Sequence, residues 1–237
     1  MNYENVILER EGHIAVLTLN RPDVLNALNK DLQDEGRAAC AEIESDDSIR
    51  VLIVTGAGRG FCAGADLTGR GAESDAKIAP QSDRLDEFGW VGRQAVSLYR
   101  MTKPTIAAVH GYCLAGAFEV MLACDISIAE EKTFLGEPEV RFGSGIIAML
   151  APWVTGPKQA KEILLTGNDR LTANQCLQMG LLNYVEKGES VFQKSFDIAR
   201  QICMASDRSV HLTKQSINQS FEFAFSQSPP SNKTDIL

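Results

Sequence analysis

The feature that most constrains the fold is a set of three short runs that we interpret as strands. They are VLIV at 51–54, TIAAV at 105–109 and CDISIA at 124–129. The first is continuously apolar and bounded by turn-forming residues, which is typical of a strand buried on both faces of a parallel sheet. We interpret two further segments as helices. The one at 28–45 precedes the run at 51–54, and the one at 84–99 lies between the runs at 51–54 and 105–109. Alternation of strand and helix predicts a single α/β domain.

The two ends of the chain predict structure of a different kind. Residues 5–9 and 13–19 are rich in β-formers and are separated by Gly12, which predicts a hairpin. Helices are predicted near the C-terminus, at 145–153, 156–165, 173–179, 190–205 and 208–225. We therefore expect a core at 1–190, a helical region at 191–225 and a disordered tail at 226–237.

Composition excludes several classes of protein. The net charge of −8 argues against nucleic-acid binding, which needs clustered Lys and Arg. No apolar run approaches the roughly 20 residues of a membrane helix, and the N-terminus lacks the pattern of a signal peptide. The six cysteines form no C-x-x-C pair, so we expect free thiols in a reducing compartment. These observations predict a cytoplasmic protein that binds neither nucleic acid nor membrane.

A glycine-rich loop, TGAGRGFCAGADL at 55–67, follows the first buried run. A dinucleotide-binding G-x-G-x-x-G pattern would need glycine where the chain has Phe61, and the G-K-[ST] of a phosphate-binding loop is absent. Two interpretations stay open: a plain turn, or a loop whose small residues at 62–65 leave backbone N–H groups open to a ligand.

A second glycine-rich turn at 110–117 leads into a predicted helix that carries Glu119. Free N–H groups at a helix N-terminus favour negative charge. Glu119 lies within an apolar segment, and burial there would raise the pKa of its carboxyl. A Cys-His nucleophile formed by Cys62 or Cys113 with His110 is conceivable, but small thiols beside glycine turns are usually structural.

Several segments, in this order, resemble the crotonase superfamily of enoyl-CoA hydratases and isomerases. They are LNRP at 19–22, NAL at 26–28, FCAGADL at 61–67, KPTIAAVHGYCLAGAFE at 103–119, CD at 124–125, EPE at 137–139, LTG at 165–167, Ala173 and GL at 180–181. The resemblance covers roughly residues 1–215. It implies an α/β crotonase-like fold, in which stacked ββα units form a spiral core with a helical C-terminal region.

The resemblance also implies a site. Its oxyanion hole would use the backbone N–H groups of Ala63 and Gly116. Glu119 would activate the water molecule, and Glu139 would give a proton to Cα of the substrate. The residues expected to contact the acyl-CoA are Val24, Leu25, Ala63, Gly64, Ala65, Asp66, Leu67 and Gly116.

The implied activity is that of an enoyl-CoA hydratase in fatty acid metabolism, with no cofactor beyond the coenzyme A of the substrate. Because the chain has both glutamates, hydration is favoured over the alternative, a Δ3,Δ2-enoyl-CoA isomerase. A homotrimer or a dimer of trimers is expected. Ile146 and Ile147 stand where relatives usually have small residues, so we expect the acyl pocket to differ. A non-catalytic crotonase-like protein is the third alternative, suggested by the ending SPPSNKTDIL in place of a further helix.

Overall fold

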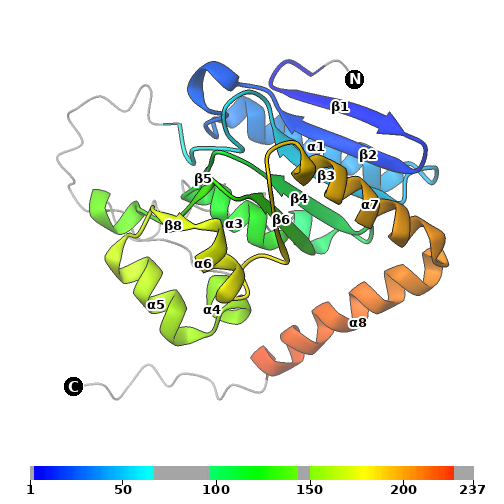
Figure 1. Ribbon diagram of the computed structural model, residues 1–237. Coiled ribbons are helices and arrows are strands. Elements are labelled where there is room, and N and C mark those ends of the chain that lie inside the picture. Colours follow the sequence, from blue (N-terminus) through cyan, green and yellow to red (C-terminus); the bar gives the residue numbers. More distant parts are fainter. Residues whose placement is uncertain (1–2, 67–94, 96, 144–149, 227–237) are drawn as a thin grey trace.

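The computed structural model describes residues 3–66, 95, 97–143 and 150–226. Its centre is a six-stranded sheet in the order β1-β2-β3-β4-β6-β9 (Figure 1). The strands are β1 (Val6–Glu11), β2 (Ile14–Leu19), β3 (Val51–Gly56), β4 (Thr105–Val109), β6 (Ile126–Glu130) and β9 (Tyr184–Glu186). β1 and β2 form the predicted hairpin, and all later neighbours pair in parallel. The predicted hairpin and the three predicted strands are therefore confirmed.

Two helices cover opposite faces of this sheet because alternate strand residues point to opposite sides. Leu52 and Val54 of β3 belong to the cluster that includes Ile43 of α1 (Lys30–Ser45). Val51 and Ile53 pack instead with the cluster that includes residues of α7 (Ser190–Met204). Figure 1 shows α7 across the near face and α1 behind the sheet. The continuous apolar run at 51–54 thus reflects burial on both faces.

A smaller sheet lies beside the large one. It has the order β5-β7-β8, with β5 (Tyr112–Leu114), β7 (Phe134–Gly136) and β8 (Leu171–Thr172). β5 leads into α3 (Gly116–Ala123), and β7 is followed by the 3₁₀ helix η2 (Glu139–Phe142). The sequence analysis placed a glycine-rich turn over β5, because three residues are too few to show a period.

The remaining helices follow in chain order: α4 (Ala151–Val154), α5 (Pro157–Thr166), α6 (Ala173–Gln178), α7 and α8 (Asp207–Ser226). Thr172 caps α6 as predicted, in a capping box with Gln175. The predicted helix at 84–99 is described only at residue 95 and residues 97–100, which are helical. Of the predicted helix at 145–153, residues 145–149 lie outside the described residues, as does nearly all of the predicted tail. Within the described part of the chain, no helix is long and apolar enough to cross a membrane.

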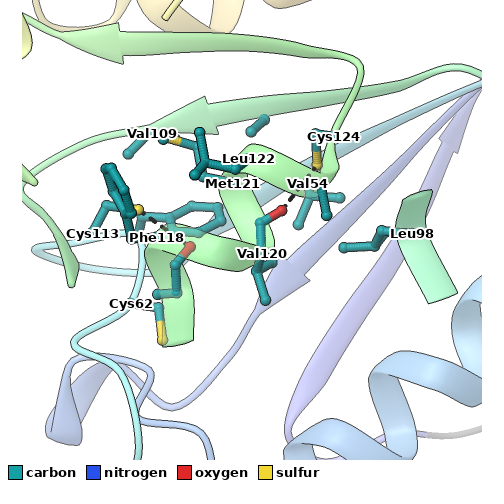
Figure 2. Packing of buried hydrophobic residues seen from close by; sticks show 14 of the residues in the cluster. Val54, Cys62, Leu98, Val109, Cys113, Phe118, Val120, Met121, Leu122 and Cys124 are labelled. Atoms are coloured by element: carbon teal, nitrogen blue, oxygen red, sulfur yellow. Dashed lines mark hydrogen bonds between the residues drawn. The ribbon is translucent and has the colours of Figure 1, made fainter. Parts of the chain in front are cut away.

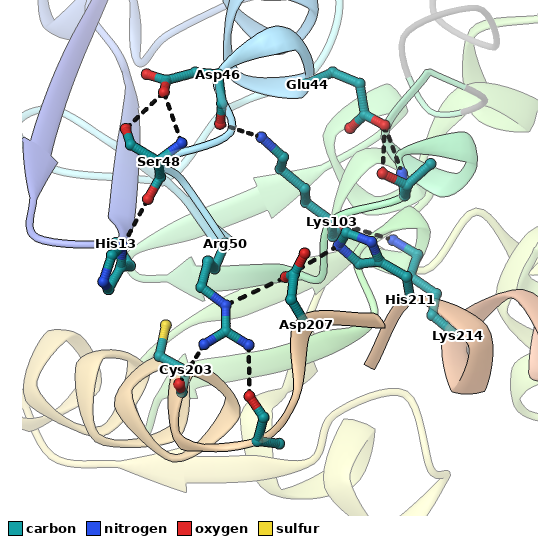
Figure 3. A network of polar contacts seen from close by, with 12 residues as sticks. His13, Glu44, Asp46, Ser48, Arg50, Lys103, Cys203, Asp207, His211 and Lys214 are labelled. Atoms are coloured by element: carbon teal, nitrogen blue, oxygen red, sulfur yellow. Dashed lines mark hydrogen bonds and ion pairs between the residues drawn. The ribbon is translucent and has the colours of Figure 1, made fainter. Parts of the chain in front are cut away.

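Polar contacts attach the corner between α7 and α8 to the sheet (Figure 3). Arg50 donates to the carbonyl oxygens of Cys203 and Ala205 and forms an ion pair with Asp207. On α8, Lys214 Nζ donates to the carbonyl oxygen of Lys103 at 3.0 Å and to Asp125 Oδ2 at 2.7 Å. The first turns of α8 are therefore held against the starts of β4 and β6, whereas its last turns extend beyond the sheet in Figure 1.

Candidate active site

Two loops that are far apart in the sequence run side by side at the edge of the small sheet. Cys62 and Cys113 form a parallel bridge, in which the N–H of Cys62 donates to Tyr112 O (2.9 Å) and the N–H of Leu114 donates to Cys62 O (3.2 Å). Figure 2 shows Cys62 and Cys113 near Phe118, in the packing around α3. Two residues further on, the loops are still in contact, since a Cβ atom built on Gly64 would lie 2.5 Å from the Cβ of Ala115.

Ala65 and Gly116, the next residue on each loop, therefore follow directly on this contact. Among the hydrogen bonds of the described residues, none uses the N–H of Ala65 or of Gly116 as donor. Ala65 is exposed and Gly116, the first residue of α3, is partly exposed, so a ligand can reach both. The N–H of Ala63, by contrast, donates to Leu25 O at 3.0 Å. The structure therefore argues against Ala63 as the second donor, and Ala65 takes its place beside Gly116.

Ala115 fixes the direction of the Gly116 N–H group. It has φ 57° and ψ −137°, a conformation that non-glycine residues rarely adopt. Its N–H donates to Gly136 O at 2.8 Å, which ties the turn before α3 to the end of β7. Strained backbone of this kind concentrates at functional sites, where the surrounding structure holds it in place.

Asn26 holds the loop that carries Ala65. Its side chain is fully buried, and Nδ2 donates to the carbonyl oxygens of Ala57 (2.9 Å), Gly60 (2.8 Å) and Phe61 (3.2 Å). The N–H of Asp66 donates to Leu28 O, and Arg21 forms an ion pair with Asp66 at 2.7 Å. The loop is thus fixed from the segment at 21–28, the segment on which Val24 and Leu25 were predicted to contact the substrate.

Glu119 lies in the first turn of α3, three residues after Gly116. Only 5% of its surface is exposed, and its Oε2 accepts a hydrogen bond from the N–H of Leu150 at 3.3 Å. Because both groups belong to the same helix start, the Glu119 carboxyl and the Gly116 N–H group are placed together.

A third carboxyl group, that of Glu137, joins Glu119 and Glu139. Glu137 follows β7 and is 1% exposed, and its N–H donates to Asn168 O at 3.0 Å. Burial raises the pKa of Glu137 well above its ordinary value, and the neighbouring Glu139, with Glu119 further away, raises it more. Glu137 thus interacts with both predicted catalytic glutamates, and we call these three residues the carboxyl cluster. The sequence analysis quoted Glu137 within EPE but gave it no role, since nothing local indicates its burial.

The cysteines next to the two donors are not activated. Burial raises the pKa of the Cys62 thiol to about 12 and that of Cys113 well above its ordinary value. A thiol in this state does not supply the thiolate that a cysteine nucleophile needs. His110 Nε2 lies 3.1 Å from Gly58 O, so its ring contacts a backbone carbonyl.

Some predicted residues are not covered by this description. Leu67, Ile146 and Ile147 lie outside the described residues. Within the part of the chain that is described, no group of three or more His, Cys, Asp or Glu side chains is arranged to hold a metal ion.

Two exposed N–H donors beside buried carboxyl groups define a class of enzyme that stabilises an oxyanion and moves protons next to it. Residues 9–231 match the family model described as enoyl-CoA hydratase/isomerase, and the chain belongs to this family. The resemblance to the crotonase superfamily is thereby confirmed.

Curated relatives and solved structures agree with this membership. The chain is 36% identical over 229 residues to a crotonyl-CoA hydratase of Syntrophomonas wolfei, covering 94% of this chain and 84% of the relative. It is 36% identical over 228 residues to a short-chain-enoyl-CoA hydratase of Clostridium acetobutylicum, with the same coverage of both chains. The crystal structure of an enoyl-CoA hydratase/isomerase from Xanthobacter autotrophicus Py2 superposes with a TM-score of 0.88 at 39% identity, covering 94% of this chain and 82% of that one. The predicted crotonase-like fold is confirmed.

Proposed function

We propose that this protein is an enoyl-CoA hydratase that adds water across the 2,3 double bond of an acyl-CoA thioester. The observation that carries the proposal is the position of the N–H groups of Ala65 and Gly116, which have no acceptor among the described residues, near the carboxyl cluster. Hydratases among the relatives, each matched over most of its length, support the same activity.

The N–H groups act on the thioester oxygen. When water adds to Cβ, negative charge moves onto this oxygen, and two preorganised donors stabilise it. Removing one such donor typically costs about 10²–10³-fold in kcat. The N-terminus of α3 adds positive potential at Gly116. Hydration of a thioester is therefore the kind of reaction that this pair of loops accelerates.

The glutamates move the protons. Glu119 takes a proton from water as the oxygen bonds to Cβ, and Glu139 gives a proton to Cα as the enolate collapses. No metal or redox group takes part in these steps. General acid-base groups of this kind typically contribute about 10²–10⁴-fold each. The coenzyme A part of the substrate would lie along Val24, Leu25 and the loop at 63–67.

Crotonyl-CoA tests the assignment. Wild-type protein should consume the conjugated double bond, followed by its absorbance, and Glu119→Gln and Glu139→Gln should each lose about 10²-fold or more in kcat. Glu162→Gln, an exposed carboxyl on α5, is the control and should keep full activity. No hydration of enoyl-CoA of any chain length would contradict the proposal. Isomerisation of a 3-enoyl-CoA that survives only one of the two site substitutions would identify the isomerase instead. Binding of coenzyme A thioesters without turnover would identify a non-catalytic protein.

We further propose a homotrimer or a dimer of trimers in the cytoplasm. Exposed apolar side chains support self-association: Phe142 is 69% exposed, Leu165 72% and Met204 86%. All six cysteines are free thiols, in keeping with a reducing compartment. Relatives carry mitochondrial and peroxisomal names in Dictyostelium discoideum and Arabidopsis thaliana, so cell fractionation is the test of location. Native mass spectrometry tests the assembly.

A further inference from the structure

Glu137 is the buried ionisable group of the site that the proposed reaction leaves without a task. Both of its carboxyl oxygens are buried and have no hydrogen-bond partner among the described residues, and the same holds for Oε2 of Glu139. A carboxylate can only accept hydrogen bonds, so two ionised carboxylates facing each other cannot bond. One proton between them would turn one group into a donor and satisfy both.

The backbone leaves Glu137 little freedom to turn away from Glu139. Gly136 is held on two sides, because its carbonyl oxygen accepts from Ala115 and a Cβ atom built on it would lie 1.9 Å from Asn168 O. The single residue between the two glutamates is Pro138, which has helical φ and ψ and fixes the step from β7 to η2. The two carboxyl groups interact, and after burial Glu139 is the largest cause of the raised pKa of Glu137.

We propose that Glu137 holds a proton in the resting enzyme and donates it in a hydrogen bond to Glu139, so that the pair stores the proton that Glu139 delivers to Cα. Glu137 is then a positioning residue that acts through Glu139. The delivery of this proton to Cα rests on the proposed hydration. The presence of a shared proton between Glu137 and Glu139 does not depend on that proposal.

The proton count of the cycle supports this arrangement. Three carboxyl groups hold one proton before the reaction, and the cluster has a charge of −2. During hydration, Glu119 gains a proton from water while the pair gives one to Cα, so the charge remains −2. Transfer of the proton from Glu119 back to the pair, directly or through solvent, restores the starting state. The buried site therefore never carries three negative charges.

The groups facing Glu137 favour a proton on it. Glu139 approaches from η2 and Glu119 from α3, and both are acidic. The Cys113 thiol on β5 also faces it, and this thiol is neutral because its pKa is raised by burial. No basic side chain is recorded as acting on Glu137 among the described residues. Two like charges at close range make one of the two carboxyl groups retain its proton.

Infrared spectroscopy tests the shared proton without activity. The wild-type protein at pH 7 should show the carbonyl stretch of a protonated carboxylic acid, and Glu137→Gln and Glu137→Met should both lack it. The control Glu162→Gln should keep it. Circular dichroism checks that each variant is folded. A protonated-acid band that persists in folded Glu137→Gln would overturn the proposal.

The pH profile of crotonyl-CoA hydration tests its consequence. In wild type, the pair loses its last proton only at raised pH, because that ionisation places two charges together. In Glu137→Gln, the amide donates to Glu139 but has no ionisable proton, so the site no longer retains the proton of the pair up to raised pH. The alkaline limb of kcat/KM should therefore move down by at least about one pH unit, with an about tenfold loss per unit. A merely structural role of Glu137 predicts an unchanged alkaline limb, and that result would overturn the proposal. If the wild type hydrates no enoyl-CoA, the proposed function fails, and the infrared result still decides on the shared proton.

Discussion

Gly64 and Ala115 lie against each other where the two site loops meet: a Cβ atom built on Gly64 would be 2.5 Å from the Cβ of Ala115 and 2.9 Å from Leu114 O. Gly64 also has φ +93°, a conformation that side chains disfavour. These two residues precede Ala65 and Gly116. Their contact therefore sets the spacing of the two proposed oxyanion donors.

Gly64→Ala should separate the loops and weaken the oxyanion hole. We expect kcat on crotonyl-CoA to fall by about 10²-fold or more, the scale of losing one donor. Gly12→Ala is a matched control, because Gly12 also has positive φ (+59°) but has no described neighbouring atom within 4 Å of the added Cβ. It should cost about 1 kcal/mol in stability and leave kcat unchanged. Full activity in Gly64→Ala would show that the spacing of the loops is unimportant.

Ala115→Gly should stabilise the protein. The conformation of Ala115 costs a non-glycine residue about 1–3 kcal/mol, whereas glycine adds roughly 0.5–1 kcal/mol of unfolded-state entropy. We expect the free energy of unfolding in urea to rise by about 1 kcal/mol. A loss of stability would mean that the methyl contact with Gly64 outweighs the strain.

Asn26→Asp should destabilise the loop at 57–61. The substitution preserves shape but replaces a buried amide donor, bonded to three carbonyl oxygens, with a group that cannot donate when ionised. The expected loss is about 3 kcal/mol or more, measured by chemical denaturation. Asn29→Asp is the control, because Asn29 caps α1 by accepting from the N–H of Leu32, and Asp accepts equally well. Equal losses in both variants would contradict the role given to Asn26.

The stability of the protein should depend on pH through Glu137. Its folded-state pKa is raised well above 4.5, so the folded protein keeps a proton that the unfolded chain releases above about pH 4.5. This contribution is complete below that pH and is lost as pH rises toward the folded-state pKa. As pH rises above about 4.5 toward the folded-state pKa, wild type should therefore lose stability relative to Glu137→Gln, by at most about 1.4 kcal/mol per pH unit. Parallel curves for the two proteins would show that Glu137 is ionised when folded.

Much of the framework could be predicted from the sequence. The runs at 51–54 and 105–109 identify buried strands because both of their faces are covered, and Thr172 is an evident helix cap. The choice between Ala63 and Ala65 could not be made locally, since it depends on a hydrogen bond from Ala63 to the distant Leu25. The role of Glu137 depends in the same way on its burial in the tertiary structure.

The small sheet β5-β7-β8 has a consequence for how this chain changes its substrate in evolution. Gly116 and Glu119 follow β5, Glu137 and Glu139 follow β7, and Ala65 lies on the loop that is bridged to β5. The reacting groups thus share one small support, the small sheet with α3 and η2 that follow its strands, while the strands of the large sheet carry none of them. Substitutions elsewhere in the chain can reshape the space for the acyl group and leave the chemistry intact. Specificity and catalysis are inherited as separable traits.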